Sequence, residues 1–195
     1  MTNQNSKLNK SKLKPGQVLK RIISKNGKEV IIKIVEQSDW RGLMHLVNSV
    51  VEEKRFLRRN KKVKANKGKE IVKKEIEAMK EKKRINICAI SNSRIIGHAG
   101  VERKKGFSSH IGKLGIIIDK NFREERIGTE LMGEVLKLAK DFLKLKMVVL
   151  GVFEVNKRAI QFYKKFGFKN YGKMPKAFLI KNKYINGLEM YKDLS

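Results

Sequence analysis

Apolar residues recur along this chain with two periods, and their order predicts where strands and helices lie. Apolar runs and period-two alternation indicate strands, whereas apolar residues spaced three and four apart indicate the inner face of a helix. In the first half, Asn26-Gly27 has the composition of a hairpin turn, and Ser38-Asp39 that of a helix cap. The elements expected there are strands at 18–23 and 29–35, helices at about 40–51 and 70–83, and strands at 85–90, 95–101 and 110–119.

The second half alternates helices and strands more regularly. A long helix at about 128–145 has an apolar face with a 3.6-residue period, so one side of it is expected to cover a sheet. After it we expect a strand at 147–153, a helix at 156–166, a strand at 168–171, a loop around Pro175 and a hairpin of 178–181 and 184–191. Strands and helices in this order predict a mixed α/β sheet with helices on both faces.

The segment between the strand Ile116-Ile117-Ile118-Asp119 and the long helix has the composition of an anion site. It is a basic turn with one glycine: Arg123-Glu124-Glu125-Arg126-Ile127-Gly128-Thr129. Backbone N–H groups at a helix start favour a phosphate, and Gly128 leaves room for its close approach. We expect Arg126 to keep a helical backbone and to offer its guanidinium to the phosphate. The alternative is an ordinary basic turn, and the P-loop pattern does not occur.

A second pattern begins at Asn156, which precedes an apolar helical repeat and is a natural N-cap. Gly167 is an ordinary helix stop, and Tyr163 could be a core aromatic. Tyr163 nevertheless follows Asn156 by seven residues, or two helical turns, which places both close to one helix face. The spacing therefore predicts that the amide and the phenol act on one site.

Together these segments resemble the cofactor-binding half of the GNAT N-acetyltransferase superfamily. In that pattern an Arg or Gln is followed, three and five residues on, by Gly and by Gly or Ala. Arg123 and Gly128 match, whereas Arg126 replaces the first Gly; the string Asn-x-x-Ala-Ile-x-Phe-Tyr-x-Lys-x-Gly-Phe from Asn156 matches at nearly every fixed position. The resemblance implies a mixed, mostly antiparallel central sheet flanked by helices on both faces. We expect this acetyltransferase domain at 18–195, after a disordered basic arm at 1–17.

The resemblance also implies acetyl-CoA as the acetyl donor and a role for each matching residue. The backbone of Ile116, Ile117 and Ile118 would pair with the pantetheine arm and polarise the acetyl carbonyl. The turn formed by Arg123, Glu124, Glu125, Arg126, Ile127, Gly128 and Thr129 would hold the pyrophosphate. Asn156 would contact the pantetheine arm, and Tyr163 would protonate the departing thiolate. The amine attacks the thioester directly in such enzymes, so no nucleophilic Ser or Cys is required.

The base that deprotonates the amine stays open. Gly151 stands where enzymes that acetylate the N-terminal alanine of a ribosomal protein carry a Glu. Glu154 has the opposite strand parity to Gly151 and is expected to point away. Glu102 and His110 near strand ends could serve, directly or through water, whereas His45 and His98 have no evident partners in the sequence and receive no role.

Charge adds a possible partner to this picture. The 195 residues include 47 Lys and Arg against 19 Asp and Glu, a formal net charge of +28. Such a charge favours anionic partners, although a lysine-rich composition alone would also explain it. The block Lys54–Lys69 carries nine cations and no acid between the first two helices. It indicates either a solvated loop or a surface for an acidic or nucleic-acid acceptor.

Cysteine content and hydropathy limit the classes of protein to which this chain can belong. Lone Cys88 lies in an apolar strand and reads as a buried small hydrophobe. No Cys/His cluster has zinc spacing, so no metal is expected. The N-terminus is polar and no apolar run has membrane-spanning length, so we expect a cytoplasmic protein without membrane contact. The oligomeric state, monomer or homodimer, stays open.

The acceptor that the resemblance favours is a primary amine, either a protein N-terminus or a lysine side chain. A small-molecule amine or polyamine is the first alternative. A basic nucleic-acid or ribosome-associated module that keeps the fold without turnover is the second. Arg126 and the missing Glu at Gly151 favour that module, whereas the Asn156–Tyr163 spacing opposes it.

Overall fold

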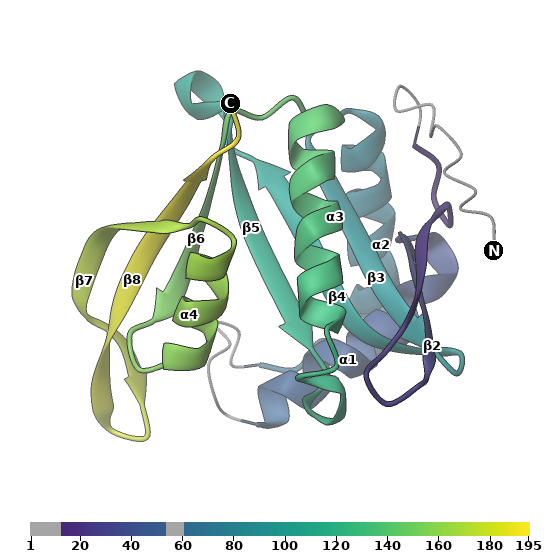
Figure 1. Cartoon of the computed structure of the whole chain (residues 1–195), viewed down its shortest axis with the longest axis horizontal. Coiled ribbons are helices and arrows are strands. Elements are labelled where there is room, and N and C mark those ends of the chain that lie inside the picture. Colours follow the sequence, from purple (N-terminus) through teal and green to yellow (C-terminus); the bar gives the residue numbers. More distant parts are fainter. Residues whose placement is uncertain (1–12, 54–60) are drawn as a thin grey trace.

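The computed structural model describes residues 13–53 and 61–195, and its centre is one eight-stranded sheet with the order β1-β2-β3-β4-β5-β6-β8-β7 (Figure 1). The strands are β1 (Val18–Ile23), β2 (Glu29–Ile34), β3 (Arg84–Ser91), β4 (Arg94–Arg103), β5 (Ile111–Ile118), β6 (Met147–Phe153), β7 (Lys169–Ile180) and β8 (Lys183–Asp193). The helices are α1 (Trp40–Glu52), α2 (Ala65–Lys80), α3 (Ile127–Asp141) and α4 (Lys157–Lys165). The succession of strands and helices agrees with the sequence pattern as far as α4.

Neighbouring strands of the sheet run antiparallel with one exception, the parallel pair β5 and β6. That pair needs a crossover connection, and α3 provides it. The predicted fold class is confirmed: a mixed, mostly antiparallel sheet with helices on both faces.

Helices cover both faces of the sheet (Figure 1), and two hydrophobic cores are buried between helices and sheet. On one face α3 packs on β3, β4 and β5, with buried residues that include Leu131, Met132 and Val135. On the other face α1 and α2 form a smaller core with Leu43, Val72 and other apolar residues. Each helix therefore buries the apolar stripe that its 3.6-residue period predicts. No helix in the described ranges is long and apolar enough to span a bilayer.

Helix α2 begins at Ala65, five residues before the predicted start at 70. Lys64 is extended and caps the helix, and its carbonyl accepts from the N–H of Gly68 at 3.0 Å. The apolar period could not reveal this first turn because its side chains are mostly lysines and small residues. The expected basic loop is thus partly helix, and its residues 54–60 lie outside the described ranges.

The expected disordered arm at 1–17 falls mostly outside the described residues. Its described end, 13–17, is tied to β2: the N–H of Gly16 donates to the Ile34 carbonyl at 3.1 Å, and the N–H of Ile34 donates to the Gln17 carbonyl at 2.9 Å. Leu13 also packs against the larger core. This short segment therefore lies beside the sheet.

The loop expected around Pro175 is wrong, because β7 runs through it from Lys169 to Ile180. β7 is the last strand of the sheet, and its pairing with β8 shifts register between Met174 and Phe178. Proline lacks an N–H donor, so an edge strand with a register shift is one of the few sheet positions that tolerate it.

Gly112 sits where β5 still pairs with β6, opposite Val148. We expect Gly112→Ala to lower the free energy of unfolding by about 1–3 kcal/mol through overpacking. The added Cβ would lie 2.5 Å from both Leu145 Cδ1 and Val101 Cγ1. Urea denaturation measures the change. The matched control is Gly133→Ala in α3, where no atom lies within 4 Å and a gain of about 0.5–1 kcal/mol is expected; equal effects at both sites would contradict the packing explanation.

Candidate active site

The parallel strands β5 and β6 separate after three residue pairs, the last of which is Lys113 with Val149 (Figure 1). β5 continues to pair with β4 as far as Ile118, and β6 pairs with β8 as far as Phe153. Within the described residues, no strand therefore pairs with the facing edges of β5 and β6 beyond this point. Backbone groups on such an edge need another partner, and a ligand can supply it.

One cavity of about 460 Å³ occupies this opening and extends under α1 and α2. The part of the cavity that lies in the opening between β5 and β6 is called the wedge half. It is lined by residues 114–117 of β5, 150–153 of β6, Asn156 and Tyr163. The helix half of the cavity is lined by Trp40, Leu43, Met44, Val47, Val63, Gly68, Ile71, Val72, Glu75, Arg84, His98, Gly100 and Glu102. Two separate parts of the chain thus share one continuous space.

Asn156 and Tyr163 both line the wedge half, so the spacing of seven residues does bring them to one site. Asn156 is the N-cap of α4, and its side-chain oxygen accepts from the N–H of Ala159 at 3.2 Å. The ring of Tyr163 is fixed by edge contacts with Phe162 and Phe168. Burial raises the pKa of Tyr163 to about 12. The phenol therefore keeps its proton at neutral pH.

The turn before α3 differs from expectation at Arg126. Arg126 is the N-cap of α3 with φ of +65°, and Glu124 has φ of +73°. The expected helical backbone at Arg126 is wrong, because both residues adopt the left-handed conformation that glycine adopts most easily. This explains why a glycine is usual at that position of the motif. Gly128, by contrast, has no close protein neighbour, since a Cβ there would meet Phe162 only at 3.7 Å.

Charged side chains hold this turn from several sides. Arg123 binds both carboxylate oxygens of Glu53 at 2.8 and 2.5 Å and donates to the Ile118 carbonyl. Glu125 accepts from the N–H of Asn26 at 2.9 Å, in the turn between β1 and β2. Glu124 pairs with Arg158 of α4 at 3.2 Å. The side chain of Arg123 therefore makes contacts within the protein. Ile127, Gly128 and Thr129 are the first residues of α3.

Strand register places three residues of β4 and three of β5 on one face of the sheet. His98, Gly100 and Glu102 lie opposite Ile117, Gly115 and Lys113, respectively. All six line the cavity. At Gly115 a Cβ would meet no atom within 4 Å. Gly115 therefore presents bare backbone that a ligand can approach closely, whereas the Asn86 side chain covers Gly100, where a Cβ would lie 2.1 Å from Asn86 Oδ1.

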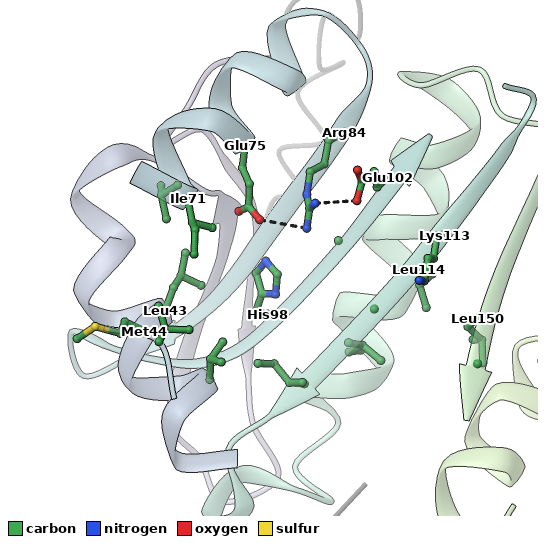
Figure 2. A pocket seen from close by; sticks show the side chains of 18 of the residues that line it. Leu43, Met44, Ile71, Glu75, Arg84, His98, Glu102, Lys113, Leu114 and Leu150 are labelled. Atoms are coloured by element: carbon green, nitrogen blue, oxygen red, sulfur yellow. Dashed lines mark hydrogen bonds and ion pairs between the residues drawn. The ribbon is translucent and has the colours of Figure 1, made fainter. Parts of the chain in front are cut away.

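A charged cluster forms the rim of the helix half (Figure 2). Arg84 bridges two carboxylates, Glu75 of α2 at 3.1 Å and Glu102 of β4 at 2.9 Å. Asn86 donates to the second oxygen of Glu75 at 2.9 Å. Burial raises the pKa of Glu75, and Arg84 opposes this effect. Sequence analysis missed Glu75 and Arg84 because they come from a helix and a strand whose packing only the fold reveals.

His98 lies in the same half of the cavity and was also missed. Its Nε2 atom is buried and has no hydrogen-bond partner in the described part of the chain. Burial, with a smaller effect of Arg84, lowers the pKa of His98 to about 4. The ring is therefore neutral at physiological pH. Period-two alternation of His98 with Gly100 and Glu102 was the available signal.

The three base candidates from the sequence fall in different places. Glu102 lines the cavity, whereas Glu154 and His110 lie outside its lining. Glu154 pairs with Lys173 at 2.7 Å and accepts from Asn186 at 2.6 Å. These two contacts lower its pKa. His110 is exposed at the far end of β5, where its carbonyl accepts from Lys146.

Cys88 is buried, and burial raises the pKa of its thiol. Its sulfur contacts Asp39 at 3.8 Å beneath α1, which is a packing position. In residues 13–53 and 61–195 no group of three or more His, Cys, Asp or Glu is placed to hold a metal ion.

The sequence and the fold both match known proteins. Residues 52–168 match the family described as the acetyltransferase (GNAT) family. The L-amino acid N-acetyltransferase AaaT of Escherichia coli K12 is 27% identical over 105 residues, which is 53% of this chain. The match spans 65% of that relative's length.

Solved structures share the fold over most of the chain. An acetyltransferase of the GNAT family from Streptococcus pneumoniae superposes with a TM-score of 0.77 at 23% identity, covering 85% of this chain and 99% of that one. The putative acetyltransferase yncA from Salmonella typhimurium, solved with its cofactor acetyl-CoA, has a TM-score of 0.75 at 14% identity and covers 85% and 94%. At such identities the likeness establishes the fold.

The left-handed backbone at Arg126 allows a direct test of the turn. Arg126→Gly is expected to raise the free energy of unfolding by about 1 kcal/mol, because glycine adopts positive φ without steric cost. Thermal and urea denaturation measure it. The control is Lys137→Gly at an exposed position within α3, where a loss of about 1 kcal/mol is expected. A loss at both positions would argue against the left-handed conformation.

Proposed function

The chain belongs to the acetyltransferase (GNAT) family, and from this premise we propose that it transfers the acetyl group of acetyl-CoA to a primary amine. The observation that carries the proposal is the open edge of β5, which faces Asn156 and Tyr163 across one cavity. A ligand in that opening lies beside unpaired backbone groups, an amide and a protonated phenol. These are the groups that an acyl-transfer site needs.

The wedge half fits the donor in shape and chemistry. Backbone groups of Ile116 are available on the edge of β5 that leaves β6, and the Asn156 amide stands on the other side. Ile117 pairs with His98 of β4, and the Ile118 carbonyl already accepts from Arg123. Free N–H groups at the start of α3, around Gly128, suit a pyrophosphate. Acetyl-CoA would supply a thioester whose carbonyl carbon accepts the amine. The chain's contribution is to orient that carbonyl and to provide a proton for the leaving sulfur.

Tyr163 is the proposed proton donor. Its phenol lines the wedge half and stays protonated, because burial raises its pKa to about 12. A thiolate that leaves beside it gains negative charge as the C–S bond breaks, and an adjacent O–H stabilises that charge and then delivers a proton. Burial disfavours the phenolate, so Tyr163 stays protonated and can act as the general acid.

The helix half is proposed to receive the acceptor amine. Its apolar wall, which includes Trp40, Leu43 and Met44, ends at the charged cluster of Glu75, Arg84 and Glu102. Such a site suits an ammonium group next to an apolar side chain. A protein N-terminus or a lysine side chain fits this description. A free amino acid is the second candidate, favoured by the similarity to an L-amino acid N-acetyltransferase.

A thiol-release assay with acetyl-CoA tests the proposal. The acceptors are L-leucine, a leucine-initiated tripeptide, Nα-acetyl-lysine and spermidine, which represent the free amino acid, the N-terminus, the lysine side chain and the polyamine. Release that requires one of these amines supports acetyl transfer, and their ranking identifies the acceptor. Salt-sensitive binding of duplex RNA, with no thiol release from any amine, would instead support a non-catalytic nucleic-acid module.

Tyr163→Phe is expected to lower kcat by about 100-fold with little change in the affinity for acetyl-CoA, because only the transferable proton is lost. Steady-state kinetics and calorimetry measure the two quantities. Tyr184→Phe is the matched control, since Tyr184 is 65% exposed on β8. Unchanged turnover in Tyr163→Phe would remove this phenol from the chemistry.

The basic block adjoins the acceptor half. Val63 and Gly68, within the described part of the block, line the cavity. Val63 is fixed to α1 through Asn48, which accepts from its N–H at 2.7 Å. Lysines around these two residues therefore stand near the entrance. We propose that they attract an acceptor, or an acceptor carrier, with negative charge.

We expect the triple variant Lys61→Gln, Lys64→Gln and Lys67→Gln to weaken the salt dependence of kcat/KM for an acidic peptide acceptor. The reason is that charge attraction is screened by salt and disappears with the charges. The control changes Lys164, Lys165 and Lys169 to Gln, which are exposed on α4 and β7. An equal effect of both triple variants would mean that net charge alone matters.

A further inference from the structure

The acceptor half of the cavity contains one buried polar atom that the described chain leaves without a hydrogen bond, His98 Nε2. Buried polar groups in proteins are nearly always satisfied, and an exception in a cavity indicates a partner that binds there. Asn86, also on this face, is satisfied through Glu75. His98 is therefore singled out by its missing partner, within a cavity that is open to a ligand.

The position of His98 is fixed by strand pairing. It lies opposite Ile117, and two residues further along β4 Gly100 lies opposite Gly115. Gly115 is exposed and has open space above its Cα. It also adjoins the edge of β5 that leaves β6. An amine above Gly115 would thus have the proposed thioester on its β6 side and the imidazole on its β4 side.

We propose that His98 is the catalytic residue that contacts the acceptor amine and takes its proton as the new C–N bond forms. This inference rests on the proposed acetyl transfer and names the base that the sequence left open. The proposed base lies on β4, the neighbour of β5, whose free edge is proposed to bind acetyl-CoA. It does not lie on β6, where Gly151 occupies the position at which some related enzymes carry a Glu.

Charges around the ring suit this role. The titratable groups that face it from the elements packed against it are Glu75 of α2, Arg84 and Cys88 of β3, Glu102 of β4 and Lys113 of β5. Arg84 lies between two carboxylates (Figure 2), and its positive charge adds to the effect of burial on the imidazole. The imidazole is uncharged at rest, with its pKa lowered to about 4. It therefore keeps a lone pair that can accept a proton.

The amine, the thioester, His98 and Tyr163 account for every bond and proton in the proposed reaction. The neutral amine nitrogen attacks the acetyl carbon, and a C–N bond forms while the C–S bond breaks. The attacking nitrogen becomes strongly acidic as it gains positive charge, and its proton passes to His98 Nε2. Tyr163 gives its proton to the departing sulfur. Exchange with water then returns the imidazolium and the phenolate to neutrality, so no further reactant is needed.

Kinetics of His98→Gln and His98→Asn test the role, with the most active amine of the acceptor panel. We expect kcat/KM for the amine to fall by about 100-fold or more, with the Kd of acetyl-CoA unchanged within about twofold. The pH profile adds a readout that packing alone would not move. Wild type should lose activity in one additional protonation step near pH 4, where the imidazole takes up a proton and can no longer act as the base, and the variants should lack that step. His45→Gln is the control, because His45 is exposed on α1.

A second measurement is independent of turnover. The chain has three histidines, so ¹⁵N NMR of the imidazoles, assigned with His45→Gln and His110→Gln, follows each ring without acetyl-CoA. The His98 ring should remain neutral at pH 6, and addition of the amine should shift its Nε2 signal alone.

The outcomes separate the two proposals. Activity of His98→Gln within threefold of wild type, or a His98 signal that ignores the amine, would overturn the assignment of the base while leaving acetyl transfer intact. Absence of thiol release by wild type with every amine would overturn the proposed function and this inference with it. If His98→Gln does not fold, His98→Asn and the NMR titration of wild type decide the question.

Discussion

The separation of β5 from β6 after Lys113 is the constraint on which the rest of the structure depends. Each strand is fully paired on its other side, β5 with β4 and β6 with β8. Neither strand can move to close the gap without breaking a long antiparallel ladder. The opening is therefore a permanent feature of the sheet, held by backbone hydrogen bonds. It leaves polar backbone groups facing a cavity, and this is the physical reason that a ligand belongs there.

The turn before α3 shows how the chain keeps other backbone groups available. Two left-handed residues, Glu124 and Arg126, on either side of Glu125, bend the chain into the helix. Their cost is met by side-chain contacts to α1 and to the β1–β2 turn, through Arg123 and Glu125. Because side chains hold the turn in place, the N–H groups at the start of α3 need not do so. An anion can then bind them without dismantling the turn.

Sequence patterns predicted the fold and the placement of Asn156 and Tyr163 at one cavity, because both depend on local features. The period of each apolar stripe, the cap at Asn156 and the spacing to Tyr163 need only a few neighbouring residues. The start of α2 and the conformation of Arg126 were misread, because a lysine-rich first turn has no apolar period and a single residue type does not reveal φ. Glu75 and His98 were missed for another reason. Their meeting depends on α2 packing against β3, the neighbour of β4 in the sheet, which is a property of the whole fold.

Burial acts on Tyr163 and His98 in opposite directions, and that opposition defines the proposed chemistry. It raises the pKa of the phenol and lowers that of the imidazole, so both groups are uncharged at neutral pH. One keeps a proton to give and the other keeps a lone pair to receive one. Both line one cavity, Tyr163 from α4 and His98 from β4. An acceptor and a thioester placed between them would meet an acid and a base that cannot neutralise each other at rest, because exchanging a proton would create two buried charges.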